Sequence, residues 1–240
     1  MSPLKNSKIR KLNIYMKWER AKAILDKIVA DRFDQSAFRK GANEDSDLRG
    51  GVCLAIALRW ILLRSQTNNH RATHRHLVKP DEIDKIFDLT REMRRTPPDN
   101  TADRANALVL VARGFDVRLE PILTICNSYA HDAPDYLAKN LKAEIGKIIS
   151  ELFIIHIDAN KANGSPVAGH SFGAFSRHRW GTREIVFFDP NWGEFHIPFH
   201  LFSHFFDGLQ AYYARHHYFF FRARIQKTEH HASAPCFPSC

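Results

Sequence analysis

The sequence lacks the features of a disulfide-rich, membrane-spanning or signal-bearing protein. Its 240 residues include four cysteines, Cys53, Cys126, Cys236 and Cys240. They are too few and too unevenly spaced for a disulfide framework or for a zinc site made of paired Cys-x-x-Cys motifs. No window of 18 apolar residues could span a membrane, and the basic start of the chain is not followed by the apolar segment of a secretory signal. The last cysteine is the final residue rather than the fourth from the end, so it forms no prenylation motif. We therefore expect a reducing working compartment.

Long basic runs are also missing, although Lys and Arg (35) outnumber Asp and Glu (26) and give a formal net charge of +9. Such a surface suits an acidic partner, for example an anionic membrane face, a nucleic acid or an acidic protein patch. Equally, it can simply keep the protein soluble. No basic run interleaved with aromatics, zinc knuckle or RNP-like strand occurs, so we expect no nucleic-acid binding.

The length favours one domain with loose ends, because a chain of this size buries one sizeable core more readily than two. Residues 1–12 are basic and polar, and residues 226–240 are polar and contain proline. We expect both to be flexible, with a single domain over residues 13–225. Apolar spacing of three or four predicts an amphipathic helix from Ile14 to Phe33, and Pro80-Asp81-Glu82 has the composition of a helix start.

Strands are expected mainly in the second half. Five segments alternate or run apolar as strands do: Leu152–Ile157, Gly169–Phe175, Ile185–Asp189, Glu194–Ile197 and Tyr218–Ile225. The polar, glycine-containing segment Ser176–Thr182 is expected to link two of them as a hairpin. Pro134–Ser150 and Phe199–Arg215 are expected to be helices, the second crossing back over the sheet. Helices first and strands afterwards indicate the α+β class.

Cys53 is the candidate nucleophile because of the segment around it. It follows Gly50-Gly51 and stands at the start of Val52 to Leu63, a run so uniformly apolar that it predicts a buried helix. The thiol is then expected at a helix N-terminus, where unpaired backbone N–H groups and the helix dipole favour thiolate over thiol. Taken alone, such a cysteine is better explained as a core residue.

His170 and Asp189 can supply the other groups that a nucleophilic cysteine needs. His170 stands near the start of one predicted strand of the hairpin and Asp189 at the end of the other, so antiparallel pairing should bring them side by side. A base beside the nucleophile, oriented by a carboxylate, is the arrangement of nucleophilic catalysis. Each residue also has a simpler explanation, as a strand histidine and as the first residue of a tight Asp-Pro-Asn-Trp-Gly turn.

Together, three segments resemble the YopT and AvrPphB family of papain-like cysteine proteases. They are the Gly-x-Cys start of the apolar helix, the Gly-His-small-aromatic strand and the Phe-Phe-Asp-Pro-Asn-x-Gly-Glu-Phe segment at 187–195, and the resemblance covers roughly Gly50 to Phe221. It implies a papain-like fold in which a helical lobe with the nucleophile helix packs on an antiparallel sheet lobe. It also implies Cys53 as nucleophile, His170 as base and Asp189 as orienting acid.

The same resemblance implies a thiol protease of the type III effector kind, a virulence protein secreted by a bacterium into the host cell. The expected partner is a host protein substrate, with a membrane-associated small GTPase or a kinase as alternatives, and the chain is expected to be a monomer without a cofactor. Two other functions stay open. The same triad could transfer the acyl group to an amine or deamidate a side chain, as a transglutaminase-like enzyme does, or the chain could be a non-catalytic basic binding module.

The oxyanion hole departs from the family pattern. Papain-like enzymes carry Gln or Asn a few residues before the cysteine, whereas this chain has Asp47 six residues before it and Leu48 five before it. An ionised carboxylate would repel a developing oxyanion. Three explanations compete: Asn43 folds back into the role, Asp47 is held protonated, or backbone N–H groups, including that of Cys53, act alone.

Histidines elsewhere do not predict a metal site. The polar segment Thr67–Lys79 includes three of them: His70, His74 and His76. They lack acidic or thiol partners in this segment, so a solvated loop is the better prediction. His200 and His204 have the spacing of a zinc-binding helix but lack the glutamate of His-Glu-x-x-His, so we expect no metal there either.

Overall fold

Three helices of the first half lie together on one side of the molecule, as the computed structural model shows: α3 (Val52–Gln66), α4 (His70–Leu77) and α5 (Pro80–Arg95). The structure describes residues 29–33, 38, 52–67, 69–95, 111–115, 117–119, 123–126, 134–161, 165–216 and 219–229. α3 is buried along most of its length, as its apolar run predicts. α5 starts as predicted, with Asp81 and Glu82 in its first turn, where carboxylates interact favourably with the helix dipole.

An antiparallel sheet forms the centre of the fold. Its strands are β1 (Val29–Arg32), β2 (Arg118–Leu119), β3 (Leu123–Cys126), β4 (Leu152–Asn160), β5 (Pro166–Arg179), β6 (Thr182–Asp189), β7 (Gly193–Pro198) and β8 (Phe219–Glu229). Their order across the sheet is β1-β7-β6-β5-β4-β8-β2, and β3 also pairs with β8. The strands expected in the second half are therefore confirmed, and the mixed composition confirms the α+β class.

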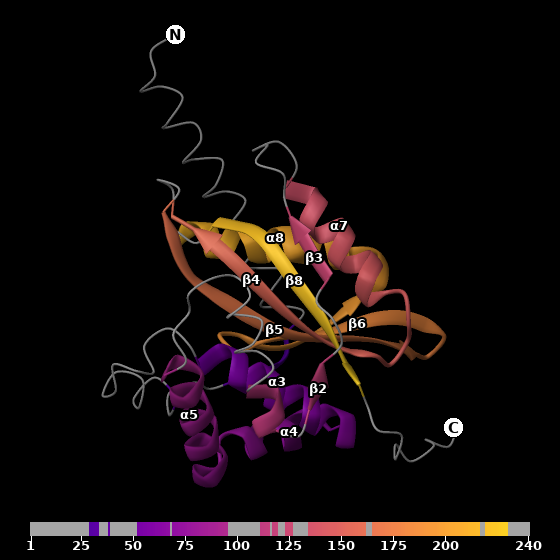
Figure 1. The fold of residues 1–240 in the computed structure, drawn as a ribbon. Coiled ribbons are helices and arrows are strands. Elements are labelled where there is room, and N and C mark those ends of the chain that lie inside the picture. Colours follow the sequence, from indigo (N-terminus) through magenta and orange to yellow (C-terminus); the bar gives the residue numbers. More distant parts are fainter. Residues whose placement is uncertain are drawn as a thin grey trace.

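Helices cover both faces of this sheet (Figure 1). α3, α4 and α5 pack on one face through a core that includes Phe175, Val186 and Phe188. α7 (Pro134–Ile145) and α8 (Phe202–Arg215), the latter preceded by the short 3-10 helix Phe199–Leu201, pack on the other face. The alternation of side chains along each strand produces the two cores. In the described part of the chain, no helix has the length and apolar character needed to cross a membrane.

Close packing of α3 on the sheet depends on a glycine. A Cβ atom at Gly173 of β5 would lie 2.5 Å from Cε3 of Trp60, so a larger residue would push the indole away. Trp60 also stacks on Phe188 of β6, with ring centroids 4.9 Å apart. These contacts fix where α3 crosses the sheet and hence where its first residues, including Cys53, come to lie.

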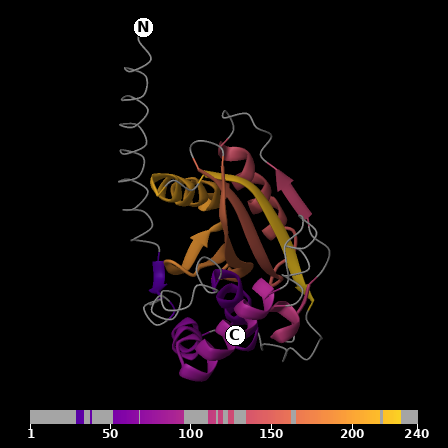
Figure 2. The ribbon, with the colours of Figure 1, turned by 60° about the vertical axis from the view of Figure 1, so that its left-hand side comes forward.

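Two predictions for the first half are wrong. The expected helix to Phe33 does not include Val29–Arg32, which form β1 at the edge of the sheet (Figure 2). There the backbone pairs with β7, which outweighs the helical spacing of the sequence. The expected loop at Thr67–Lys79 contains α4, capped by Asn69, whose Oδ1 accepts a hydrogen bond from the third residue of the helix at 3.1 Å. Residues 14–28 lie outside the described residues.

Three boundaries in the second half also differ from the prediction. The hairpin link is shorter than Ser176–Thr182, because β5 continues to Arg179 and the chain reverses at Trp180-Gly181, whose φ angles of +50° and +76° suit a two-residue hairpin turn. α7 ends at Ile145, before the predicted Ser150. The flexible tail cannot begin at Gln226, because β8 pairs with β4 over most of its length and runs to Glu229. Residues 1–12 and 230–240 lie outside the described residues.

Candidate active site

Cys53 follows the first residue of α3, as predicted from its position in the apolar run. The residue as a whole is partly exposed to solvent. The thiol shares a hydrogen bond with His170 of β5, and the backbone N–H of Ser171 also donates to the sulfur. The cysteine is thus in contact with a base at the helix N-terminus, whose dipole favours a negative charge.

Asp189 and His170 meet because β5 and β6 form the expected hairpin. Residue pairs along the two strands run from Arg179 with Thr182 to Gly173 with Phe188, which brings the end of β6 beside the start of β5. His170 Nε2 lies 2.8 Å from Asp189 Oδ1, and the carboxylate is fully buried. Since Nε2 faces the carboxylate, Nδ1 is the ring nitrogen left for the thiol. The three residues predicted from sequence are therefore joined in one hydrogen-bonded chain.

The charges in this chain favour a thiolate beside an imidazolium. Burial raises the pKa of Cys53, but the hydrogen bond and the positive charge of His170 and the N–H of Ser171 more than offset it, so the pKa falls below its ordinary value. Burial lowers the pKa of His170, but the charge and hydrogen bond of Asp189, helped by Cys53, raise it to about 10. Both shifts favour the reactive pair of a thiolate and an imidazolium over the neutral pair.

Tyr213 of α8 is a member of the site that the sequence did not reveal. Its hydroxyl donates to Asp189 Oδ2 at 2.8 Å, and lies 3.0 Å from His170 Nε2. It accepts a hydrogen bond from Asn191 Nδ2 at 2.8 Å, and the backbone N–H of Asn191 donates to Asp189 Oδ1 at the same distance. Burial and the Asp189 charge raise the pKa of Tyr213 well above its ordinary value, so it stays a donor. The spacing of Leu209 and Tyr213 on one helix face indicates a core position but not this contact.

The backbone around His170 is held tightly against β4. A Cβ atom at Gly169 would lie 2.6 Å from Nε2 of His156, so a larger residue does not fit between the strands. Nδ1 of His156 lies 2.9 Å from the hydroxyl of Ser171, which anchors the residue whose N–H contacts Cys53. The Gly-His-Ser sequence thus positions both the base and a donor to the sulfur.

The proposed oxyanion residues Asn43 and Asp47 lie outside the described residues, as does the side chain of Cys126. His200 and His204 are both exposed. His74, expected in a solvated loop, is buried on α4, and its Nδ1 lies 3.3 Å from Asp31 Oδ2. Within the described ranges, one group of side chains has metal-ligand atoms close together: His70, Glu194 and His196.

Comparison with known proteins supports the fold. No protein-family model matches the sequence, and no curated protein matches it. The crystal structure of the Pseudomonas avirulence protein AvrPphB matches with a TM-score of 0.60 and 16% identity, over 86% of this chain and 100% of that chain. PatoxP, a cysteine protease-like domain of the Photorhabdus asymbiotica toxin PaTox, matches with a TM-score of 0.39 and 11% identity, over 95% of this chain and 64% of that one. The second likeness is too weak to support a shared fold. The first shows that this chain has the fold of AvrPphB, which confirms the architecture expected from the sequence resemblance.

Proposed function

We propose that this protein is a cysteine endopeptidase whose catalytic residues are Cys53, His170 and Asp189. The observation that carries the proposal is the hydrogen-bonded chain from the Cys53 thiol, through an imidazole, to a fully buried carboxylate. A structural role for the thiol alone would require neither the base nor the carboxylate. Nucleophile, base and orienting acid are the three roles that covalent hydrolysis by a cysteine needs.

In this mechanism the Cys53 thiolate attacks the carbonyl carbon of a peptide bond and forms a C–S bond. The His170 imidazolium then gives its proton to the leaving amine as the C–N bond breaks, which leaves a thioester and a neutral imidazole. Water attacks the thioester while His170 takes its proton, and the carboxylic acid and the thiolate separate. Asp189 holds the imidazole in orientation and stabilises its charged form throughout.

We further propose that the enzyme is a bacterial effector that acts on a host protein in a reducing cytosol. The fold shared with an avirulence protein supports this, as does the spacing of the four cysteines, which does not suit a disulfide framework. A membrane-associated small GTPase or a kinase are the substrate classes to test first. A net charge of +9 is compatible with work at an anionic membrane surface.

The test is to add the wild-type protein and Cys53→Ala to a eukaryotic cell lysate and to compare protein termini by mass spectrometry. New termini with the wild type alone support the protease. An intact protein with a side chain of shifted mass, again with the wild type alone, contradicts it and identifies acyl transfer or deamidation.

A second measurement covers the case in which the lysate lacks the substrate. An epoxide inhibitor of thiol proteases should label Cys53 selectively in the wild type, and His170→Asn should suppress the labelling. Labelling of Cys53 no faster than that of Cys236 or Cys240 contradicts an activated nucleophile and favours a binding module.

A further inference from the structure

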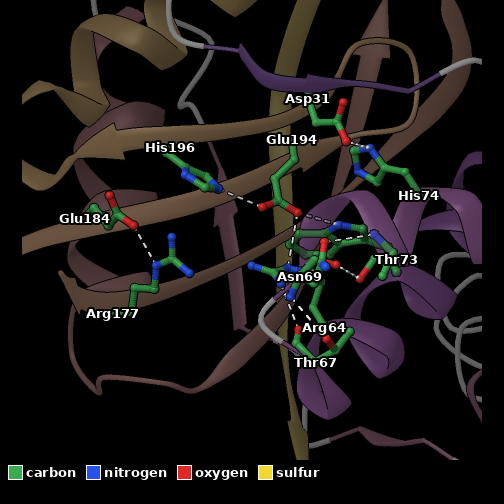
Figure 3. Close-up of polar contacts among 12 residues, drawn as sticks. Asp31, Arg64, Thr67, Asn69, Thr73, His74, Arg177, Glu184, Glu194 and His196 are labelled. Carbon is green, nitrogen blue, oxygen red and sulfur yellow. Dashed lines mark hydrogen bonds and ion pairs between the residues drawn. The ribbon is translucent and has the colours of Figure 1, made fainter. Parts of the chain in front are cut away.

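A second polar cluster lies between α3, α4 and β7, on the sheet face that packs against α3. Its centre is Glu194, which is fully buried (Figure 3). Glu194 Oε2 accepts a hydrogen bond from Trp60 Nε1 at 3.1 Å and lies 3.2 Å from Nε of Arg64. Glu194 Oε1 lies 2.8 Å from Nε2 of His196, which is two residues further along β7 on the same face. Asp189 of β6 points to the opposite face of the sheet, where it contacts Tyr213 of α8. The cluster around Glu194 is therefore separate from the triad.

His70 completes the cluster from α4. Its ring meets that of His196 edge to face, with centroids 5.6 Å apart. Each of the three residues His70, Glu194 and His196 offers one possible ligand atom, and these three atoms all lie within 4.8 Å of one another. A point between three such atoms is no more than about 2.8 Å from each, so side-chain movements of about 0.7 Å would bring all three to the 2.0–2.1 Å of a zinc–ligand bond.

The surroundings of Glu194 suit a metal ligand. Trp60 and Arg64 both contact Oε2, whereas Oε1 faces the imidazole of His196. A carboxylate held by one oxygen and ligating through the other is a common arrangement around bound metal ions. Both histidines are partly exposed, so an ion can enter and keep a water molecule as its fourth ligand.

The positive charge of Arg64 opposes a cation in this cluster. Arg179 opposes a cation as well, because its Nη1 lies 3.5 Å from Nδ1 of His196. Asp31, which lies 3.3 Å from His74, adds a negative charge on the same side, and the charge of Arg177 is paired with that of Glu184 at 2.6 Å. Arg64 neutralises part of the Glu194 charge and should make metal binding weaker than in a site without it. The other two ligands are imidazoles, a ligand type that suits zinc and similar divalent ions.

We propose that His70, Glu194 and His196 form a binding site for a divalent transition-metal ion of the zinc class. The bound ion would join α4 to β7 and thereby fasten the helical side of the molecule to the sheet. The sequence argument against a metal at His70 was the lack of a nearby acid, and the fold supplies that acid from 124 residues further along the chain.

The test measures Zn²⁺ binding by calorimetry at slightly alkaline pH, where histidine is neutral. The parent protein carries Cys53→Ala, Cys236→Ser and Cys240→Ser, so that neither the triad thiol nor the terminal thiols bind the ion. We expect one Zn²⁺ per chain at a site that weakens at least about tenfold in His70→Ala and in His196→Ala. The matched control is His200→Ala/His204→Ala, which removes two exposed histidines with zinc-helix spacing and should leave the affinity unchanged.

Thermal unfolding with and without Zn²⁺ gives an independent readout, since an ion that binds only the folded state raises the midpoint. The midpoint should rise in the parent and the control but not in the His70 and His196 variants. If His196→Ala fails to fold, His70→Gln, on a partly exposed helix position, serves instead. Equal affinity in the His70 variants and the parent, a loss caused by the control, or no binding by the parent overturns the proposal.

Discussion

Tyr213→Phe should weaken the candidate active site without disturbing the packing around it. The substitution removes one hydroxyl and keeps a ring that packs against His170 and Phe220, with centroid distances of 5.2 Å in both cases. Among the described residues, that hydroxyl is the donor to Asp189 Oδ2, at 2.8 Å. The variant therefore leaves one oxygen of a fully buried carboxylate without this hydrogen bond.

The magnitude follows from the charge and burial of the acceptor. A hydrogen bond to a charged group contributes about 1.5–3 kcal/mol to the free energy of unfolding. For a chain of this size that corresponds to a fall of about 3–12 °C in the unfolding midpoint. If Tyr213 also holds Asp189 against His170, its loss makes the imidazolium less stable and raises the pKa of Cys53. A loss of about 1.4 kcal/mol at the ion pair moves that pKa by about one unit.

The assay is the rate of alkylation of Cys53 by iodoacetamide as a function of pH, which needs no substrate. The rise of this rate with pH reports thiolate formation, and in Tyr213→Phe it should shift upward by about one pH unit. Tyr212→Phe, which removes the same atom from the neighbouring position on α8, is the matched control and should leave the profile in place. A lower unfolding midpoint with an unchanged or downward-shifted profile would refute the positioning role.

Three other predictions concern the packing and charges that support the site. Gly173→Ala should lower the free energy of unfolding by about 1–3 kcal/mol, measured by urea denaturation, because the added methyl group meets the indole of α3; an unchanged stability would contradict this packing. Glu194→Gln should lower the free energy of unfolding by about 3–5 kcal/mol, since it leaves the fully buried guanidinium of Arg64 without its charge partner. Adding Arg64→Met should recover much of this loss. If the double variant is no more stable than Glu194→Gln alone, the ion pair is not the cause of the loss. In a Cys53→Ser background, Asp189 still raises the pKa of His170 above its value in the unfolded chain. The contribution of His170 to the free energy of unfolding should therefore be complete below about pH 6.5 and lost at alkaline pH. A stability difference between this protein and its His170→Gln variant that grows as the pH rises would contradict the prediction.

The three candidate residues could be identified from the sequence because each lies in a local pattern that survives folding. Cys53 opens an apolar run, and His170 and Asp189 lie on segments whose alternation identifies a hairpin. Pairing within a hairpin is local, so the approach of the base to the carboxylate follows from the sequence. The approach of the cysteine to the base does not, because it depends on where α3 crosses the sheet.

Contacts between distant segments account for what the sequence did not reveal. Tyr213 reaches Asp189 only because α8 crosses the end of β6, and Trp60 meets Glu194 across 134 residues of chain. α4 escaped prediction because the residues on its buried side include Thr73 and His74, so it lacks the apolar stripe that marks an amphipathic helix. Such polar buried positions are decided by their partners, and these are set by the tertiary fold.

The most direct test of the central claim is the alkylation rate of Cys53 at about pH 6 in the wild type and in His170→Asn. At that pH a thiol with an ordinary pKa is ionised in only about three molecules per thousand. If His170 holds Cys53 as a thiolate, the wild type should react at least about tenfold faster than such a thiol, and His170→Asn should lose that advantage. Equal rates in the two proteins, or a Cys53 that reacts no faster than Cys236, would contradict the account.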